Sequence, residues 1–287
     1  MVQRLLLAGC GKLGTELGLR RAAAGDRVFG LRRQASLLPA PLEPISADLA
    51  DPDSLATRLP DNLDAVVFTA TPGAFNDAAY EQAYVRGLGN LLRALEQTEQ
   101  RPQRLIFVSS TSVYGDTGGD WVDETSTPEP QAFSGERLLQ AEALLAAVGD
   151  RGVVLRLGGI YGPGRERLLK RVREARPVVA DPPSYTNRIH QTDCVGVLEH
   201  LLELPRPATL YLGVDDRPAP MHEVLDWLAD SMGMDRVPRQ SGSPGDQRGS
   251  NKRCSNRRLR RSGYQFVYPD YRHGYRAMLD QEASDTH

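Results

Sequence analysis

Short apolar runs alternate with helical stretches over the first 160 residues of the chain. Helical spacing of apolar residues fills 13–24, 80–96 and 135–148. Five short runs between and around these stretches read as buried strands: 2–8, 27–31, 65–70, 105–109 and 153–157. Alternating strands and helices are typical of βαβ units. The pattern therefore predicts an α/β fold built on a doubly wound parallel Rossmann sheet.

The remainder of the chain predicts a second region. We expect a Rossmann domain over 1–160, to which a late strand near 209–214 can return. A smaller C-terminal α+β region would follow over 161–280, with a polar tail over 281–287. Glycine, serine and proline enrich 238–249, which predicts a mobile loop.

Composition narrows the class of protein. The chain has 287 residues, 40% of them hydrophobic, enough to bury the core of one large or two joined domains. No run approaches the roughly 18 apolar residues of a membrane span, and the N-terminus lacks a signal peptide's pattern, so we expect a cytoplasmic protein.

Cys10, Cys194 and Cys254 are scattered and read as reduced thiols without a disulfide or zinc site. A formal net charge of −2 indicates neither nucleic acid nor membrane as a partner.

A glycine-rich turn follows the first predicted strand and opens the first predicted helix. The segment reads Gly9-Cys10-Gly11-Lys12-Leu13-Gly14. Its first glycine suits a tight turn, the second a close approach of a pyrophosphate, and the third close packing of helix on strand. The helix N-terminus would then offer N–H groups to phosphates. We expect a dinucleotide to bind at Gly9, Gly11, Lys12, Leu13 and Gly14; the alternative is a purely structural turn.

The second predicted strand ends in Leu31-Arg32-Arg33. NAD-specific domains usually place an acidic residue there, against the ribose 2′-hydroxyl, whereas guanidinium groups can bind a 2′-phosphate through charge-assisted hydrogen bonds. Arg32 and Arg33 therefore favour NADP, with NAD left open. The alternative is a solvated strand end.

Four further segments carry a family resemblance. They are Phe107-Val-Ser-Ser-Thr-Ser-Val-Tyr-Gly115, Pro130–Glu142, Leu155-Arg-Leu-Gly-Gly-Ile-Tyr-Gly-Pro-Gly164 and Asn187-Arg-Ile-His-Gln-Thr-Asp193. Together with the glycine turn they resemble an extended short-chain dehydrogenase/reductase of the NAD-dependent epimerase/dehydratase type. Two departures mark an atypical member: the glycines are spaced Gly-x-Gly-x-x-Gly, and Phe133 and Arg137 stand where the family has tyrosine and lysine.

The resemblance implies roles for individual residues. Asp48 and Leu49 would meet adenine, and Thr69 and Ala70 would lie beneath the cofactor. Asp48 could instead cap a helix beginning near Pro52. Ser110 would hydrogen-bond the substrate's reacting oxygen, and Arg137 would hold the cofactor's ribose.

The residue that exchanges a proton is left unassigned. Phe133 carries no exchangeable proton, and the Arg137 guanidinium stays protonated. Tyr114 is the candidate we place in the catalytic site, and Tyr161, Glu124 and His190 could also shuttle protons. Each has a structural alternative: tyrosines in such turns usually pack their rings, and a lone histidine is more often structural.

The resemblance places substrate contacts in the second region. Tyr161, Arg188 and His190 belong to its family motifs. The segment 251–261 is strongly basic, so Arg253 could clamp a nucleotide diphosphate. Equally, Asn256 can start a short helix whose charged face is solvated. The pattern after Lys252 resembles a small bacterial subgroup of sugar-nucleotide-epimerase-like proteins.

Two functions follow as hypotheses. The first is an NADP-preferring oxidoreductase or epimerase that transfers hydride to or from a nucleotide-sugar-like or phosphorylated polyol substrate. The second is a non-catalytic protein that senses NADP(H) or regulates a partner. The two helices 80–96 and 135–148 could also form a homodimer, or simply be buried within one chain.

Overall fold

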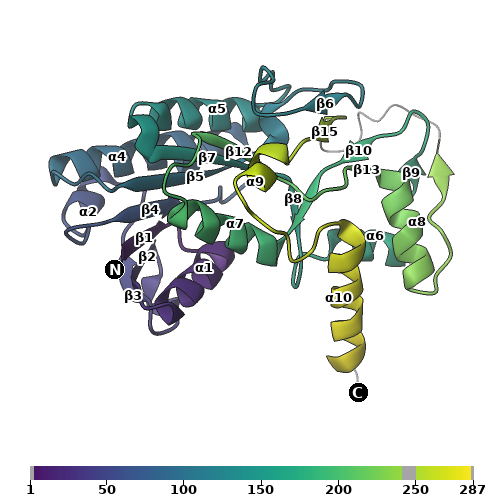
Figure 1. The fold of residues 1–287 in the computed structure, drawn as a ribbon, viewed down its shortest axis with the longest axis horizontal. Helices are drawn as coiled ribbons and strands as arrows, with labels where there is room; N and C mark the ends of the chain where they lie inside the picture. Colours follow the sequence, from purple (N-terminus) through teal and green to yellow (C-terminus); the bar gives the residue numbers. More distant parts are fainter. Residues whose placement is uncertain (1–2, 241–249, 286–287) are drawn as a thin grey trace. The chain divides into compact units, whose positions relative to one another are not determined.

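The computed structural model describes residues 3–240 and 250–285 and contains a seven-stranded sheet (Figure 1). Its strand order is β12-β7-β5-β4-β1-β2-β3, and β1 pairs in parallel with β2 and β4, as do β2 with β3 and β4 with β5. This arrangement confirms the predicted doubly wound α/β fold. The strands are β1 (Arg4–Ala8), β2 (Arg27–Arg32), β3 (Glu43–Ser46), β4 (Ala65–Phe68), β5 (Arg104–Ser110), β7 (Gly152–Leu157) and β12 (Leu210–Gly213).

Two of these strands lie at the edges of the sheet. β12 forms one edge, in the segment where a late returning strand is predicted. β3 forms the other, and the sequence gives no signal for it because its four residues alternate between half-buried and exposed positions and include Pro44. An edge strand tolerates proline, since one side of its backbone has no strand partner.

The chain divides into two compact units. Unit 1 comprises the residues up to 113, 132–156 and 195–211, and unit 2 comprises 114–131, 157–194 and the residues from 212 onward. The chain therefore passes between the units several times, whereas the sequence predicts one boundary near residue 160 and one later return of a strand near 209–214.

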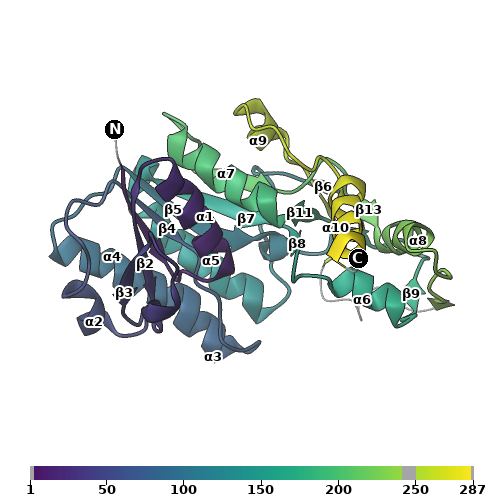
Figure 2. The same ribbon diagram turned by 90° about the horizontal axis from the view of Figure 1, so that it is seen from below.

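Helices cover both faces of the sheet in unit 1 (Figure 2). On one face α1 is tied to α7 by ion pairs from Arg20 to Glu199 and from Arg21 to Glu203. Asp51 accepts hydrogen bonds from the first-turn N–H groups of α2, so the suggestion that Asp48 caps this helix is wrong. The helices are α1 (Lys12–Ala23), α2 (Pro52–Ala56), α3 (Asp77–Tyr80), α4 (Gly87–Gln97), α5 (Phe133–Ala146) and α7 (Gln191–Glu203), with short 3₁₀ turns at Ala35–Leu37, Thr111–Val113 and Gly149–Arg151.

The helix predicted over 80–96 contains an unexpected feature. A π-helical segment, Glu81–Arg86, joins α3 to α4. Segments of this kind are rare and lie often at functional sites. Hydrophobic spacing gave no sign of it.

One buried ion pair holds α5 to the sheet. Arg156 on β7 donates from Nε and Nη2 to Glu142 on α5 at 3.0 and 2.6 Å, and both side chains are almost fully buried. Ser109 Oγ donates to the same carboxylate at 2.6 Å. These three polar side chains form one network in a low-dielectric interior. Removing any one of them would therefore lower the free energy of unfolding.

Unit 2 is built from short strands and helices around a smaller core. Buried apolar residues of α6, α8 and α10 form this core, among them Leu169, Val224, Leu228 and Tyr275. Its elements are β6 (Trp121–Val122), β8 (Gly159–Tyr161), α6 (Arg167–Arg173), β9 (Val178–Val179), β10 (Tyr185–Thr186), β11 (Arg188–His190), β13 (Ala219–Pro220), α8 (Met221–Ser231), β14 (Arg239–Gln240), β15 (Arg253–Cys254), α9 (Arg257–Arg261) and α10 (Tyr271–Asp285).

Three predictions from the sequence concern residues of unit 2. The short helix α9 follows Asn256, as one of the two alternatives for this segment expects. Residues 281–285, expected to belong to a polar tail, instead continue α10. The first turns of the helix pack on the core through Tyr271, Tyr275 and Met278, and adding residues to an established helix is favourable. Of the predicted mobile loop, residues 241–249 lie outside the described part of the chain, and 239–240 form β14.

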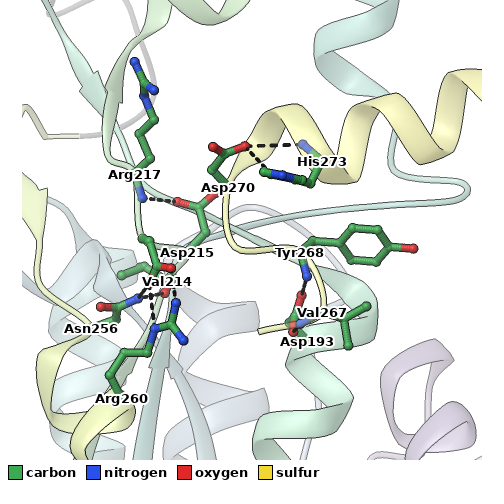
Figure 3. Close-up of polar contacts among 11 residues, drawn as sticks. Asp193, Val214, Asp215, Arg217, Asn256, Arg260, Val267, Tyr268, Asp270 and His273 are labelled. Carbon is green, nitrogen blue, oxygen red and sulfur yellow. Dashed lines mark hydrogen bonds and ion pairs between the residues drawn. The ribbon is translucent and has the colours of Figure 1, made fainter. Parts of the chain in front are cut away.

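Asp193 fastens the segment that precedes α10 (Figure 3). Its fully buried carboxylate accepts hydrogen bonds from Tyr264 Oη at 2.9 Å, Val267 N at 2.8 Å and Tyr268 N at 3.0 Å. Several hydrogen bonds to one carboxylate offset the cost of burying its charge.

Within residues 3–240 and 250–285, no helix combines the length and the apolar character that crossing a bilayer requires. The same residues contain no cluster of three or more His, Cys, Asp or Glu side chains that could hold a metal ion. Cys10, Cys194 and Cys254 are buried, and none of the three takes part in a disulfide.

Candidate functional site

The glycine turn after β1 is held over the ends of two neighbouring strands. Gly9 N and Cys10 N donate to Leu31 O at 3.0 and 2.9 Å, and Thr69 Oγ1 donates to Gly9 O at 3.1 Å. Gly9 has a φ of +80°, and a Cβ there would lie 2.4 Å from the Cα of Ala70. Only glycine fits this position, because both its backbone conformation and the neighbouring chain exclude a side chain.

The N-terminus of α1 is open to an anion. Gly11 is its N-cap and supplies no side-chain hydrogen bond, and the first turn contains no acidic residue. The first N–H groups of a helix have no acceptor within the helix and carry a partial positive charge. A Cβ at Gly11 would meet only Gly9 O, at 3.9 Å, so a phosphate could approach this backbone closely.

A cavity of about 810 Å³ lies at this end of the sheet. Its position beside β1 and β4 is where the strand order reverses direction, the place at which open α/β sheets bind ligands. The glycine turn, the ends of β2 and β3, and the segment after β4 line it. The lining residues are Gly9, Cys10, Gly11, Leu31, Arg32, Arg33, Gln34, Ala47, Asp48, Leu49, Ala50, Ala70, Thr71, Gly73, Ala74, Ala79, Gln82 and Ala83.

The structure brings seven of the predicted cofactor residues to this cavity and leaves five outside its lining. Those at the cavity are Gly9, Gly11, Arg32, Arg33, Asp48, Leu49 and Ala70, and those outside it are Lys12, Leu13, Gly14, Thr69 and Arg137. Sequence reasoning missed the segment 71–83, which contributes Thr71, Gly73, Ala74, Ala79, Gln82 and Ala83. Its place directly after a central strand is the only signal that could have found it, since its residues are small and carry no motif.

Arg32 and Arg33 present positive charge to the cavity. Arg32 Nη1 lies 3.5 Å from Cys10 O, and neither guanidinium has an ion-pair partner among the described residues. Unpaired guanidinium groups beside a cavity suit a phosphate. Asp48 is a weaker candidate for ligand contact, because its Oδ1 already accepts from Ala50 N at 3.0 Å.

The residues of the predicted catalytic site in unit 1 have partners within the protein. Ser110, at the end of β5, is half-buried, and its Oγ accepts from Ser112 N at 3.1 Å. Arg137 donates from Nε and Nη2 to the two carboxylate oxygens of Asp77, both at 2.8 Å, and one Nη2–Oε2 distance to Glu81 is 3.9 Å. Binding of a ribose by Arg137 stays a prediction and would require this pair to rearrange.

Phe133 lies among aromatic rings. Its ring centroid is 5.2 Å from that of Phe75 and 5.3 Å from that of Tyr80, and Tyr80 is 5.5 Å from Tyr84. Phe75 is 57% exposed, which is unusual for a large apolar side chain. Phe133, which the sequence resemblance places where the family has a tyrosine, is therefore an apolar ring in contact with the phenol of Tyr80 on a different helix.

The proton-shuttle candidates of unit 2 are buried. Tyr114 is 1% exposed and its hydroxyl donates to Asp123 O at 2.8 Å. Glu124 Oε1 accepts from Leu212 N at 3.0 Å, and burial raises the pKa of its carboxyl. Tyr161 stacks on Tyr275 with centroids 4.4 Å apart, and burial raises its pKa far above the usual range. Contacts of this kind agree with the structural alternatives to proton transfer that the sequence analysis gave for these candidates.

Three of the predicted substrate residues lie inside unit 2. Tyr161, Arg188 and His190 are almost fully buried; the ring centroids of Tyr161 and His190 are 5.1 Å apart, and Arg188 lies over the ring of Tyr271 at 5.4 Å. Arg253 is more accessible: it lies over Trp121 and Tyr185 at 5.2 and 4.8 Å and donates to Gly119 O at 2.6 Å.

Asp215 gives unit 2 a predicted pH dependence. Burial raises the pKa of its carboxyl to about 8, although the charge of Arg188 acts in the opposite direction. An unfolded aspartate has a pKa of about 3.9, so between these values the folded chain keeps a proton that the unfolded chain has lost. This contribution to stability is complete below about pH 4 and is lost as the pH rises through about 8.

We expect the free energy of unfolding to fall by about 2–3 kcal/mol between pH 5 and pH 7 because of this group, at up to about 1.4 kcal/mol per pH unit. Urea unfolding at both pH values measures it. Asp215→Asn keeps the acceptor for Arg217 N and should remove most of that dependence. Equal pH dependence of the wild type and this variant would show that Asp215 is ionised in the folded chain.

Comparison with known proteins gives four findings. Residues 5–180 match the model of the NAD dependent epimerase/dehydratase family. A protein of Methylobacillus flagellatus, provisionally described as an NAD-dependent epimerase/dehydratase, is 38% identical with a TM-score of 0.82, over 99% of this chain and 100% of that one. The 3-diazoavenalumate denitrifying reductase of a Streptomyces species is 27% identical over 253 residues, 80% of this chain and 82% of that protein. MoeE5, solved with UDP-glucose and NAD, shares the fold at 23% identity and a TM-score of 0.77, over 99% of this chain and 100% of that one.

Proposed function

Because the chain belongs to the NAD-dependent epimerase/dehydratase family, as its motifs predict, we propose that it is an NADP-preferring oxidoreductase or epimerase-like enzyme. The observation that carries the proposal is the open N-terminus of α1, set with the Gly9 turn at a cavity of about 810 Å³. The chemistry of this region fits a dinucleotide: N–H groups for the pyrophosphate and guanidinium groups for a ribose phosphate. A bound nicotinamide would supply or accept a hydride.

The preference for NADP rests on Arg32 and Arg33. Both line the cavity, and a 2′-phosphate offers each guanidinium a charge-assisted hydrogen bond that a 2′-hydroxyl does not. NAD would lose this attraction and gain nothing from a carboxylate, since the end of β2 carries none.

The substrate we propose is a nucleotide-sugar-like or phosphorylated polyol. Support comes from the family and from MoeE5, which binds UDP-glucose on the same fold. Ser110 would polarise the reacting oxygen from the end of β5. Arg253 would meet an anionic part of the substrate, whereas Tyr161, Arg188 and His190, being buried, would act by shaping unit 2.

Calorimetric titration with NADPH and NADH tests the cofactor. The wild type should bind NADPH more tightly, and Arg32→Ala with Arg33→Ala should weaken NADPH binding roughly 10- to 100-fold with little effect on NADH, as expected for the loss of charged hydrogen bonds. Arg58→Ala with Arg101→Ala is the matched control, because both residues are exposed and absent from the cavity lining. Failure of the wild type to bind either dinucleotide would contradict the proposal.

A turnover assay separates the enzyme from a non-catalytic sensor. The purified protein with saturating NADPH is offered a panel of nucleotide sugars and small carbonyl compounds, and oxidation of NADPH is followed. Binding without hydride transfer to any of them would favour the sensor. In that case Phe133→Tyr with Arg137→Lys would show whether restoring the family's pair restores chemistry.

A further inference from the structure

Residues 71–83 form one wall of the cofactor cavity in unit 1, and we call this segment the cavity wall. The residues of the wall that line the cavity are Thr71, Gly73, Ala74, Ala79, Gln82 and Ala83. Three other residues of the same segment, Phe75, Asp77 and Tyr80, contact α5. The cavity wall therefore joins the cofactor cavity to the helix that carries Phe133 and Arg137.

Helical spacing explains why the cavity wall has two sides. Ala79, Gln82 and Ala83 are separated by three and four positions, so they share one side of the helix, and this side lines the cavity. Asp77 and Tyr80 are three positions apart on another side, which contacts α5. Movement of this helix relative to α5 would therefore change the shape of the cavity.

Two residues of α5 make these contacts with the cavity wall. Arg137 donates from Nε and Nη2 to the two carboxylate oxygens of Asp77, both at 2.8 Å. The ring centroid of Phe133 lies 5.2 Å from that of Phe75 and 5.3 Å from that of Tyr80. The sequence resemblance places the family's tyrosine and lysine at these same two positions of α5. Both departures from the family pattern thus lie in contact with the cavity wall.

The side chains of Phe133 and Arg137 suit this attachment. A guanidinium donates two parallel hydrogen bonds to one carboxylate, which a lysine ammonium cannot do in the same geometry. Arg137 Nη1 also donates to Gln140 Oε1 at 2.9 Å, so its side chain is oriented from its own helix as well. A phenyl ring at position 133 adds aromatic contacts without a hydroxyl that needs a partner.

We propose that Phe133 and Arg137 are positioning residues, which hold the cavity wall against α5 and thereby fix the shape of the cofactor cavity. The inference rests on the proposed function, because the ligand that benefits is the dinucleotide. Arg137 acts on the cofactor through Asp77 and the cavity wall, not by touching the ribose. Since the wall carries no charged side chain into the cavity, the effect should be the same for NADPH and NADH.

Direct contact of Arg137 with the ribose is the competing role. The two roles predict opposite effects when Asp77 is replaced. If the pair holds the cavity wall, losing the Asp77 carboxylate weakens dinucleotide binding. If Arg137 binds the ribose, the same change removes a competitor for the guanidinium, and binding stays equal or becomes tighter.

Calorimetric titration of Asp77→Ala, Arg137→Ala and the double variant tests the pair. Each single variant should bind NADPH and NADH about 3- to 10-fold more weakly, as expected for a bidentate pair that is partly exposed. The double variant should bind about as well as either single variant, because all three lack the same contact. Arg32→Ala with Arg33→Ala differs, since it should weaken NADPH far more than NADH.

Glu43→Ala is the matched control for the ion pair. It removes an exposed pair with Arg27 within unit 1, and neither residue lines the cavity. Both dinucleotide affinities should stay within about twofold of the wild type. The midpoint of thermal unfolding should shift by less than about 3 °C in all of these variants, which separates the positioning role from a general loss of stability.

Phe133 is tested by a pair of substitutions. Phe133→Ala removes the ring contacts with Phe75 and Tyr80 and should weaken both dinucleotides by about the same factor as Arg137→Ala. Phe133→Tyr keeps the ring and should bind both dinucleotides as the wild type does.

Hydrogen–deuterium exchange of the protein without dinucleotide measures the attachment itself. Backbone amides of residues 71–83 should exchange faster in Arg137→Ala than in the wild type, whereas those of α1 should not change, because local opening depends on the contacts of each segment. Equal exchange of residues 71–83 in the two proteins overturns the attachment, whatever the affinities are.

The titrations have distinct outcomes. Equal or tighter binding by Asp77→Ala, or losses that add up in the double variant, overturns the positioning role and leaves the proposed function standing. Wild-type affinity in Phe133→Ala overturns the part assigned to Phe133. A wild type that binds neither dinucleotide overturns the proposed function, and the inference falls with it.

Discussion

Replacing Gly9 with alanine is expected to destabilise unit 1 by about 2–5 kcal/mol and to abolish measurable NADPH binding. The added Cβ would lie 2.4 Å from Ala70 Cα and 2.5 Å from Ala70 N, both backbone atoms, in a residue with a φ of +80°. Relief requires the turn to lift away from β4, which breaks the Thr69 hydrogen bond to Gly9 O and displaces the start of α1. Urea unfolding and calorimetric titration measure the two effects.

Gly25→Ala is the matched control for this variant. Gly25 has a φ of +99°, but no atom lies within 4 Å of the position of its Cβ. The Gly25→Ala variant should lose about 1–2 kcal/mol of its free energy of unfolding because of the backbone conformation alone, and it should bind NADPH normally. If Gly9→Ala behaved in the same way, close contact with Ala70 would be excluded as the reason for glycine at position 9.

Replacing Glu142 with alanine is expected to lower the free energy of unfolding by about 3–5 kcal/mol, because it removes the carboxylate that pairs with the buried charge of Arg156. The substitution removes two hydrogen bonds from Arg156 and the 2.6 Å bond from Ser109. The carboxylate cannot be replaced by water without opening the contact between α5 and β5, since both charged side chains are at most 10% exposed. Chemical unfolding of the purified variant measures the loss.

Two companion variants test the cause of that loss. Glu136→Ala removes an exposed acid from the same helix and should change stability by less than about 0.5 kcal/mol. Glu142→Leu with Arg156→Met replaces the whole pair by apolar side chains and should recover most of the stability. A double variant as unstable as Glu142→Ala would mean that helix packing, and not the loss of the carboxylate beside Arg156, causes the instability.

The sequence predicts those parts of the fold that depend on residues close together in the chain. Apolar runs in the sequence predict β1, β4, β5 and β7 directly. The glycine turn is predicted because it lies between a strand and a helix whose apolar patterns are both clear. β3 escapes prediction because an edge strand needs no apolar run. The π-helical segment escapes because hydrophobic spacing does not distinguish it from the α-helix on either side.

The candidate site shows the same division. Arg32 and Arg33 are predicted from their place at the end of β2, and the structure brings both to the cavity. The partners of Arg137 cannot be predicted, because Asp77 is 60 positions away in the chain. Likewise the cluster of Phe75, Tyr80 and Phe133 joins two segments that are distant in the chain, and only their folded arrangement shows that a phenol lies next to Phe133.

The hydrogen bonds of Asp193 bear on the order in which the protein can fold during its synthesis. Three of the donors to this buried carboxylate come from Tyr264, Val267 and Tyr268, 71 to 75 positions later in the chain. While a ribosome is still adding those residues, α7 has already emerged with Asp193 lacking these donors. Unit 2 therefore reaches its final packing only after almost the entire polypeptide has been made. Until then its unpacked residues are exposed, and a chaperone would bind unit 2 during this interval.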